Sequence, residues 1–218
     1  MTKVKICGVR EVTHALSAAE AGADFVGFIL APGRRQVSPE MAKEIVAALK
    51  GLEHPPLTVG VFVNAKAEEV NRIVRFAGLD MVQLSGDESW EYSLAIDRPI
   101  TKVVHVPDYK SSRELMSHLE LGRRTLGERP FIPLLDSGGS GAYGGTGEVF
   151  DWEVVGDIPE EFTAVVAGGL TPENVGELVR RTKPWGVDVS SGVETEGRKD
   201  SLKIRAFLEA VRQADQKI

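Results

Sequence analysis

Cysteine is almost absent from this sequence, since Cys7 is the only one among 218 residues. A single thiol rules out an internal disulfide. It also argues strongly against a zinc site built from cysteines, because such sites combine several thiolates. The remaining question is whether this one thiol is a small packing residue or a reactive group.

Long apolar runs and an excess of positive charge are also missing. No run approaches the roughly 20 residues of a membrane-spanning helix, and the first residues, MTKVKICGVR, lack the apolar core of a signal peptide. The net charge is −6, with basic residues interspersed among acidic ones, which argues against nucleic acid or anionic membrane as the main partner. We therefore expect a cytoplasmic protein without either partner. The oligomeric state is left open.

What the sequence does contain is a regular series of short apolar segments. Most are near-continuous runs of Val, Ile, Leu and Phe, which is typical of parallel strands buried on both faces. The eight segments are 4–7, 25–30, 58–63, 80–84, 100–106, 131–135, 164–168 and 186–190. Segments with helical spacing separate them, at about 27 residues per strand–helix unit. The pattern predicts a single (β/α)8 barrel over residues 1–218, with an open doubly wound sheet as the alternative.

Two kinds of local signal support these units. The sequences SPE (38–40) and TPE (171–173) predict helix starts, with an N-cap hydroxyl, a proline at the first position and an acid in the first turn. A weak repeat links GADFVG, from Gly22, with GLDMVQ, from Gly78, two units apart. The residues expected to share buried helix faces are Met41, Ile45, Val46 and Leu49, and Ile204, Phe207, Leu208 and Val211.

Polar residues stand where the predicted strands end, the place at which (β/α)8 barrels carry their active sites. These residues are Cys7, Arg34, Arg35, Asn64, Gln83, Ser85, His105 and Asp136. A thiol, guanidinium groups, amides, a carboxylate and small loops would thus converge on one rim, as in a catalytic mouth.

Glycines and serines follow the last two strands, in AGGL (167–170) and DVSSGVE (188–194). Glycine lets backbone N–H groups approach an anion, and phosphate sites of such barrels often lie at these two loops. A third glycine-rich loop, SGGSGAYGGTG, covers 137–147. It contains GSGAYG (139–144), which fits a dinucleotide-binding pattern, but a long helix does not follow. The alternative for each loop is that glycine merely turns the chain.

Single residues allow two interpretations each. Cys7 is a packing residue if it points outward, but if it shares the barrel interior with Lys5, the ammonium could favour its thiolate. Asp136 either caps its loop or forms an acid–base couple with the thiol. Arg34 and Arg35 are either a solvated pair or a clamp for a carboxylate.

Several segments together resemble the phosphoribosylanthranilate isomerase family. The matching segments, in chain order, are KVKICGVR, GFILAPGRRQVSPE, VGVFVN, VQLSGDES, LLDSGGSGAYGGTGEVFDW, AGGLTPENV and VDVSSGVETEGRKD. They run from residue 3 to about residue 207. Among them, the K-I-C-G opening and the D-V-S-S-G-V-E segment are specific to this family.

The resemblance implies an Amadori rearrangement of a phosphorylated aminosugar, in tryptophan biosynthesis, with no metal and no redox cofactor. Cys7 matches the general base, Asp136 the general acid and Arg35 the arginine that holds the anthranilate carboxylate. Lys5, Gln83 and Asp188 remain as further candidates for the substrate site. The residues that fall in the phosphate-binding region of the family are Gly144, Gly145, Gly147, Gly168, Gly169, Ser190, Ser191 and Gly192.

The sequence departs from the family at one position and leaves two rival functions. The family commonly reads V-Q-L-H-G, whereas this chain has Ser85 in VQLSG. One rival is the histidine-pathway isomerase, which performs the same rearrangement on a larger bisphosphate, but Cys7 and the lack of a clear half-repeat argue against it. The other is a noncatalytic barrel that binds a phosphorylated ligand.

Overall fold

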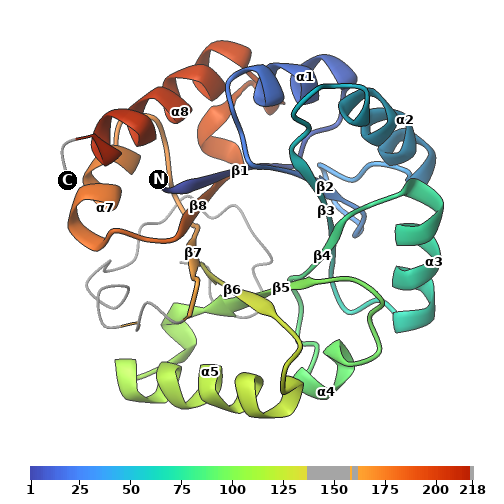
Figure 1. The fold of residues 1–218 in the computed structure, drawn as a ribbon, viewed down its shortest axis with the longest axis vertical. Helices are drawn as coiled ribbons and strands as arrows, with labels where there is room; N and C mark the ends of the chain where they lie inside the picture. Colours follow the sequence, from blue (N-terminus) through green and yellow to red (C-terminus); the bar gives the residue numbers. More distant parts are fainter. Residues whose placement is uncertain (137–157, 159–161, 217–218) are drawn as a thin grey trace.

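The structure, a computed structural model, describes residues 1–136, 158 and 162–216. Parallel strands β1 to β8 close a barrel in sequence order, and helices surround it (Figure 1). The strands are β1 Lys3–Cys7, β2 Phe25–Ile29, β3 Leu57–Phe62, β4 Met81–Leu84, β5 Ile100–His105, β6 Phe131–Asp136, β7 Val165–Val166 and β8 Gly186–Val189. The helices are α1 Val12–Glu20, α2 Pro39–Lys50, α3 Ala67–Ala77, α4 Trp90–Ser93, α5 Ser112–Leu126, α7 Val175–Thr182 and α8 Ser201–Asp215.

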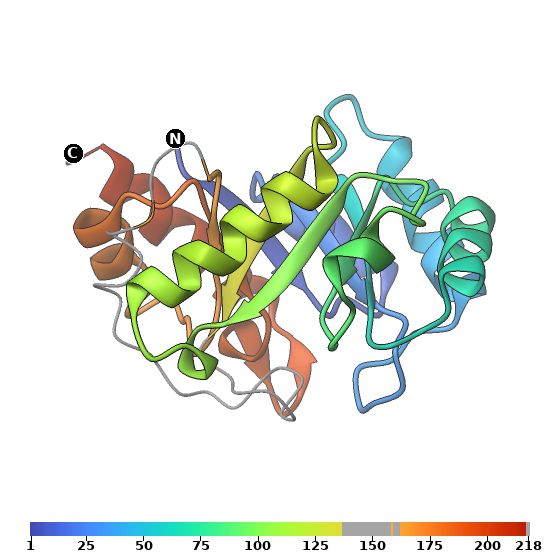
Figure 2. The same ribbon diagram turned by 90° about the horizontal axis from the view of Figure 1, so that it is seen from below.

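The predicted (β/α)8 barrel is confirmed, and each predicted strand lies within two residues of an observed one at either end. The open sheet is excluded because β8 pairs with β1, with Val4 in register with Val187. Two 3₁₀ turns, η1 Val106–Asp108 and η2 Ser191–Val193, and a small hairpin of β9 Glu194–Thr195 and β10 Arg198–Lys199 add to the barrel. Both ends of the described chain lie close together (Figure 2), where the Thr2 hydroxyl donates a hydrogen bond to Asp215.

One predicted helix start is confirmed and the other is wrong. Helix α2 begins at Pro39, and the Ser38 hydroxyl accepts a hydrogen bond from the backbone N–H of Met41. Helix α7 begins at Val175 instead of Pro172. The reason is that the Asn174 side chain accepts a hydrogen bond from the Thr171 N–H and donates one to the Gly169 carbonyl, which fixes a separate turn before the helix.

The predicted buried faces of α2 and α8 hold with one exception. All four residues predicted for α8 are buried, and so are Ile45, Val46 and Leu49 of α2. Met41 lies in the first turn of α2, near the helix end, and is 38% exposed.

The weak repeat has a structural cause. Gly22 and Gly78 both have positive φ at the end of a helix, and each is followed two residues later by an aspartate at the start of a strand. The Asp24 carboxylate accepts a hydrogen bond from the N–H of Val4 in β1, and the Asp80 carboxylate accepts one from the N–H of Thr58 in β3. Each aspartate therefore fastens its strand to the preceding one, at the end of the barrel opposite the strand C-termini.

Apolar side chains fill the lower barrel interior and the layer between barrel and helices. The interior contains one cluster with Phe25, Val59 and Met81 and another with Val103 and Leu134. Because this packing closes the barrel from below, a ligand can enter only at the C-terminal ends of the strands. Within the described ranges, no helix has the length and hydrophobicity needed to cross a membrane.

Candidate active site

A cavity of about 410 Å³ opens at the C-terminal ends of the strands, as the sequence predicts for a catalytic mouth. It brings together most of the residues that follow the predicted strands. Its polar lining consists of Cys7, Arg34, Arg35, Gln83, Ser85, His105, Asp136, Asp188, Ser190 and Ser191, with Gly168 and Gly169 between them. Asn64 is not among the lining residues, since its side chain bonds to the carboxylate and the backbone N–H of Asp87. Gly144, Gly145 and Gly147 lie outside the described residues.

Strand alternation turns Cys7 and Lys5 into the barrel interior, so the condition under which the ammonium could favour the thiolate is met, and the catalytic role of Cys7 stays a prediction. Cys7 is 5% exposed and lies in register with Gly27 of β2. A Cβ atom at position 27 would lie 3.0 Å from Cys7 Sγ and 3.1 Å from Lys5 Nζ. Glycine at this position therefore leaves the room that the thiol and the ammonium occupy.

Lys5 and Asp188 form a buried ion pair directly below the cavity. Lys5 Nζ donates a hydrogen bond of 2.8 Å to Asp188 Oδ1, and both side chains are less than 10% exposed. Burial alone would lower the pKa of Lys5, but Asp188 and Cys7 outweigh it, and the pKa of Lys5 is raised above its ordinary value. Lys5 therefore stays a cation beside the thiol.

The expected effect of Lys5 on Cys7 is present but does not prevail. Burial raises the pKa of the Cys7 thiol above its ordinary value, and the negative charge of Asp188 adds to this. Lys5 and Lys199 act in the opposite direction and reduce the rise. Desolvation of the thiol in the barrel interior is thus larger than the attraction of the two cations.

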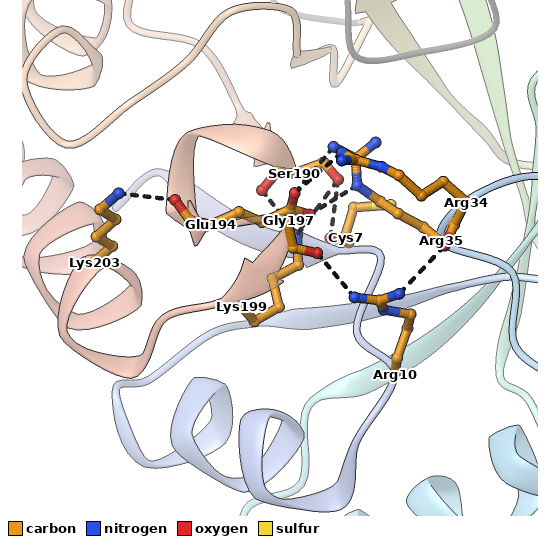
Figure 3. Close-up of polar contacts among 9 residues, drawn as sticks. All are labelled: Cys7, Arg10, Arg34, Arg35, Ser190, Glu194, Gly197, Lys199 and Lys203. Atoms are coloured by element: carbon orange, nitrogen blue, oxygen red, sulfur yellow. Dashed lines mark hydrogen bonds and ion pairs between the residues drawn. The ribbon is translucent and has the colours of Figure 1, made fainter.

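Arg35 is held by Glu194, a residue whose role the sequence reasoning missed (Figure 3). The guanidinium donates from Nε and Nη2 to the Glu194 carboxylate, at 2.7 and 3.1 Å. Lys199 Nζ donates to the same carboxylate at 2.9 Å. Burial works to raise the pKa of Glu194, but the hydrogen bonds from Arg35 and Lys199 outweigh it and lower the pKa to about 2. The ion pairs fix the guanidinium at the cavity wall, and no contact within the described residues occupies its Nη1.

The two arginines of the doublet differ in their surroundings. The Arg34 side chain is 69% exposed and its Nη2 lies 3.7 Å from Glu194, whereas Arg35 is 14% exposed. Arg10 lies below them in the view of Figure 3 and donates to the carbonyls of Arg34 and Gly197, which ties the loop after β2 to the β9–β10 hairpin. Arg35 is therefore the arginine with a fixed orientation.

The loops after β7 and β8 pack against each other. Gly168 and Gly169 have φ values of 91° and 61°, a left-handed conformation that favours glycine. Gly192 does not line the cavity, and a side chain there would collide with the Leu170 carbonyl. Ser190 Oγ donates to the Cys7 carbonyl at 3.2 Å, and its hydroxyl and carbonyl both accept from Lys199. The arrangement suits an anion held by backbone N–H groups and serine hydroxyls.

The side of the cavity formed by β4 and β5 is built differently. Gln83 Nε2 donates to the Ser85 hydroxyl at 3.0 Å, while Gln83 Oε1 has no partner within the described part of the chain. His105 stands at the end of β5, in register with Asp136 at the end of β6. Within the described ranges, no group of three or more His, Cys, Asp or Glu side chains could hold a metal ion.

Comparison with protein families gives a match over residues 4–210 to the family described as N-(5'-phosphoribosyl)anthranilate (PRA) isomerase. The chain belongs to the PRA isomerase family. A relative from Dehalococcoides mccartyi, named N-(5'-phosphoribosyl)anthranilate isomerase, is 46% identical over 99% of this chain and 98% of its own length. One from Roseiflexus sp. with the same name is 41% identical over 99% of this chain and 100% of its own length.

Solved structures of PRA isomerases have the same fold. The enzyme from Thermotoga maritima superposes with a TM-score of 0.82 at 36% identity, covering 98% of this chain and 100% of that one. A PRA isomerase in complex with reduced 1-(o-carboxyphenylamino)-1-deoxyribulose 5-phosphate has a TM-score of 0.78 at 35% identity, with the same coverage. The family resemblance noted from the sequence motifs is thereby confirmed.

Proposed function

We propose that this chain converts N-(5-phosphoribosyl)anthranilate to 1-(2-carboxyphenylamino)-1-deoxyribulose 5-phosphate, as a single cytoplasmic domain over residues 1–218, in tryptophan biosynthesis. What carries the proposal is that Cys7 and Asp136 line the same cavity of a chain that belongs to the PRA isomerase family. A barrel that only binds a phosphorylated ligand needs anion-binding loops. It has no use for a thiol and a carboxylate on two sides of one cavity.

The reaction needs one acid and one base. Asp136 donates a proton to the ring oxygen as the C1–O bond breaks, and the nitrogen lone pair forms the C=N bond of a protonated Schiff base. This group acidifies the proton on C2, which Cys7 removes to give an enolamine. The enolamine then tautomerises to the ketone. The product is an isomer of the substrate, so the net reaction consumes no oxidant or reductant. Each proton transfer by a positioned group contributes typically about 10²–10⁴ in rate.

The cavity offers grips for both ends of the substrate. We assign the anthranilate carboxylate to Arg35, whose guanidinium suits a planar anion. The phosphate is assigned to the loops of Gly168, Gly169, Ser190, Ser191 and Gly192, with Gly144, Gly145 and Gly147 kept as sequence-based predictions. Lys5, Gln83 and Asp188 stand beneath the sugar. Contacts at both ends of the substrate orient the sugar between the acid and the base. This orientation lowers the activation free energy of the reaction.

The raised pKa of Cys7 defines the state in which the cycle starts. Burial raises the pKa of the Cys7 thiol above its ordinary value, which favours the protonated form. Only the thiolate can accept the C2 proton, so the step that uses Cys7 becomes faster as the pH rises toward that pKa. Lys5 and Lys199 keep the thiolate accessible because both lower the pKa of Cys7.

The test is the decay of substrate fluorescence with wild type and Cys7→Ser. Serine keeps the shape of the side chain, but its hydroxyl is a far weaker acid, so we expect kcat to fall by about 10²–10⁴. Circular dichroism and the thermal midpoint serve as folding controls and should stay near those of wild type. Turnover within a few-fold of wild type would make Cys7 a packing residue. No turnover by wild type would favour the noncatalytic barrel.

A further inference from the structure

His105 is a buried imidazole that has no hydrogen-bond partner among the described residues. It is 9% exposed, and neither Nδ1 nor Nε2 has a partner in the part of the chain that the structure describes. Both nitrogens are also shielded from water in this conformation, so solvent does not replace the missing bonds. Buried polar groups in proteins are nearly always hydrogen-bonded, because an unmade bond costs free energy. The fold therefore maintains His105 at a cost to its own stability.

The position of His105 indicates what its partner is. It lines the cavity at the end of β5, and its Cα is in register with that of Asp136 on β6. Side chains in register on neighbouring parallel strands point to the same side, and the strands lie about 4.8 Å apart. A ligand group that hydrogen-bonds to His105 is thus a close neighbour of the group that Asp136 contacts.

Of the four histidines in the chain, His105 alone lines the cavity. The position before Gly86, at the end of β4, carries Ser85, whose hydroxyl already accepts a hydrogen bond from Gln83. An imidazole offers at least one N–H donor in either protonation state. His105 is therefore suited to bind a neutral oxygen of the ligand, next to the site of acid catalysis.

We propose that His105 donates a hydrogen bond to the C3 hydroxyl of the sugar. This rests on the proposed function, in which Asp136 protonates the ring oxygen on C4. Carbon 4 is flanked by C5, which carries the phosphate, and by C3, which carries a hydroxyl. The phosphate loops follow β7 and β8, on one side of β6, and β5 lies on the other side. A sugar with C5 directed toward β7 and β8 directs C3 toward β5, where His105 stands.

The contact explains why the imidazole is retained. In the empty enzyme it is desolvated and unbonded, and the substrate supplies the missing partner. The imidazole loses its water when the protein folds. Binding therefore gains the hydrogen bond without a further free-energy cost for desolvating the imidazole. Replacing His105 by an apolar ring of similar size should accordingly weaken binding and leave the fold equally stable or more stable.

The experiment compares two ligands and two proteins. The ligands are reduced 1-(o-carboxyphenylamino)-1-deoxyribulose 5-phosphate and the same molecule without the C3 hydroxyl. The proteins are wild type and His105→Phe, and the dissociation constants are measured by calorimetry. We expect wild type to lose about 3–10-fold in affinity when the hydroxyl is removed. His105→Phe should bind both ligands equally, at the weaker affinity, with a thermal midpoint no lower than that of wild type.

A matched control and a direct readout make the test specific. His118 lies outside the cavity and stacks with Trp90 and Tyr109, so His118→Phe should retain the full effect of the hydroxyl. In wild type, the imidazole NMR signals of His105 should shift when the first ligand is added and less so with the second. His105→Gln, whose amide can still donate, should recover part of the difference between the ligands.

Three outcomes would overturn the proposal. One is an equal loss of affinity on hydroxyl removal in wild type and in His105→Phe. Another is a set of His105 NMR signals that the ligand does not move. The third is a large fall in the thermal midpoint of His105→Phe, which would make His105 a structural residue. Normal turnover of the substrate by wild type in the same series would show that the proposed function stands even if this contact does not.

Discussion

Two groups of buried polar side chains lie at opposite sides of the same cavity and differ in how their polar atoms are paired. The paired cluster, near β1, β2 and β8, consists of Lys5, Asp188, Arg35, Glu194 and Lys199, and each charge in it has an opposite charge within 3.1 Å. The open pair consists of Gln83 and His105 on β4 and β5, which retain polar atoms without partners in the described ranges.

The two sides are therefore prepared for a ligand in different ways. A buried charge without a partner is too costly to keep, so the protein pairs its own ions and thereby fixes their positions. A neutral amide or imidazole costs less to leave unbonded, so the protein can reserve it for the ligand. The paired cluster orients groups before the ligand arrives, whereas the open pair gains its bonds only when the ligand binds.

The largest expected effect comes from removing the acid that stands next to the open pair. Asp136→Asn keeps the size and polarity of the side chain but cannot supply the proton for ring opening, so kcat should fall by about 10² or more. Binding should survive, so the open-chain reduced product should bind the variant about as well as wild type. A near-normal kcat would show that Asp136 is not the general acid, and Cys7 would be the remaining acid–base candidate.

The paired cluster is tested by separating the two arginines. Arg35→Ala should raise KM by about 10-fold or more, because a charged hydrogen bond to the anthranilate carboxylate is lost. Arg34→Ala is the matched control, and its KM should stay within about 3-fold of wild type because that guanidinium is largely exposed. Steady-state kinetics of both variants decide the matter, and equal small effects would mean that neither arginine grips the substrate.

The smallest effect is expected from Glu194→Gln, and it appears in the dependence of stability on pH. The pKa of Glu194 is about 2 in the folded protein, below the ordinary value of about 4.3. Its stabilising contribution is therefore present above about pH 4.3 and is lost as the pH falls toward 2. Urea unfolding between pH 5 and pH 3 should show a shallower loss of stability in the variant than in wild type. Identical slopes would show that Glu194 is not held by its cations.

The sequence predicts the barrel well because strands buried on both faces carry a strong and repeated signal. Residues at strand ends, such as Cys7, Arg35 and Asp136, follow from the fold alone, since all parallel strands of a barrel end on one rim. The repeat around Asp24 and Asp80 is detectable for the same reason, because one structural role recurs at a fixed spacing.

Other features escape the sequence because they depend on partners far along the chain. Glu194 and Lys199 face each other across strands of two residues each, which are too short to show a periodic pattern. The pKa of Cys7 depends on how deeply the thiol is buried relative to Lys5, and residue order does not give this depth. The start of α7 depends on side-chain hydrogen bonds of Asn174 to the Thr171 N–H and the Gly169 carbonyl, which residue order alone does not reveal.

The aspartates at the opposite end of the barrel have a consequence for how this protein can change over evolutionary time. The carboxylates of Asp24 and Asp80 accept hydrogen bonds from backbone N–H groups of the neighbouring strands, at the end of the barrel opposite the cavity. These bonds help to fix the register of β1 with β2 and of β3 with β4. The loops at the mouth then contribute less to the stability of the barrel. Residues in these loops can therefore change, and a different substrate can be accommodated, without a change in the barrel itself.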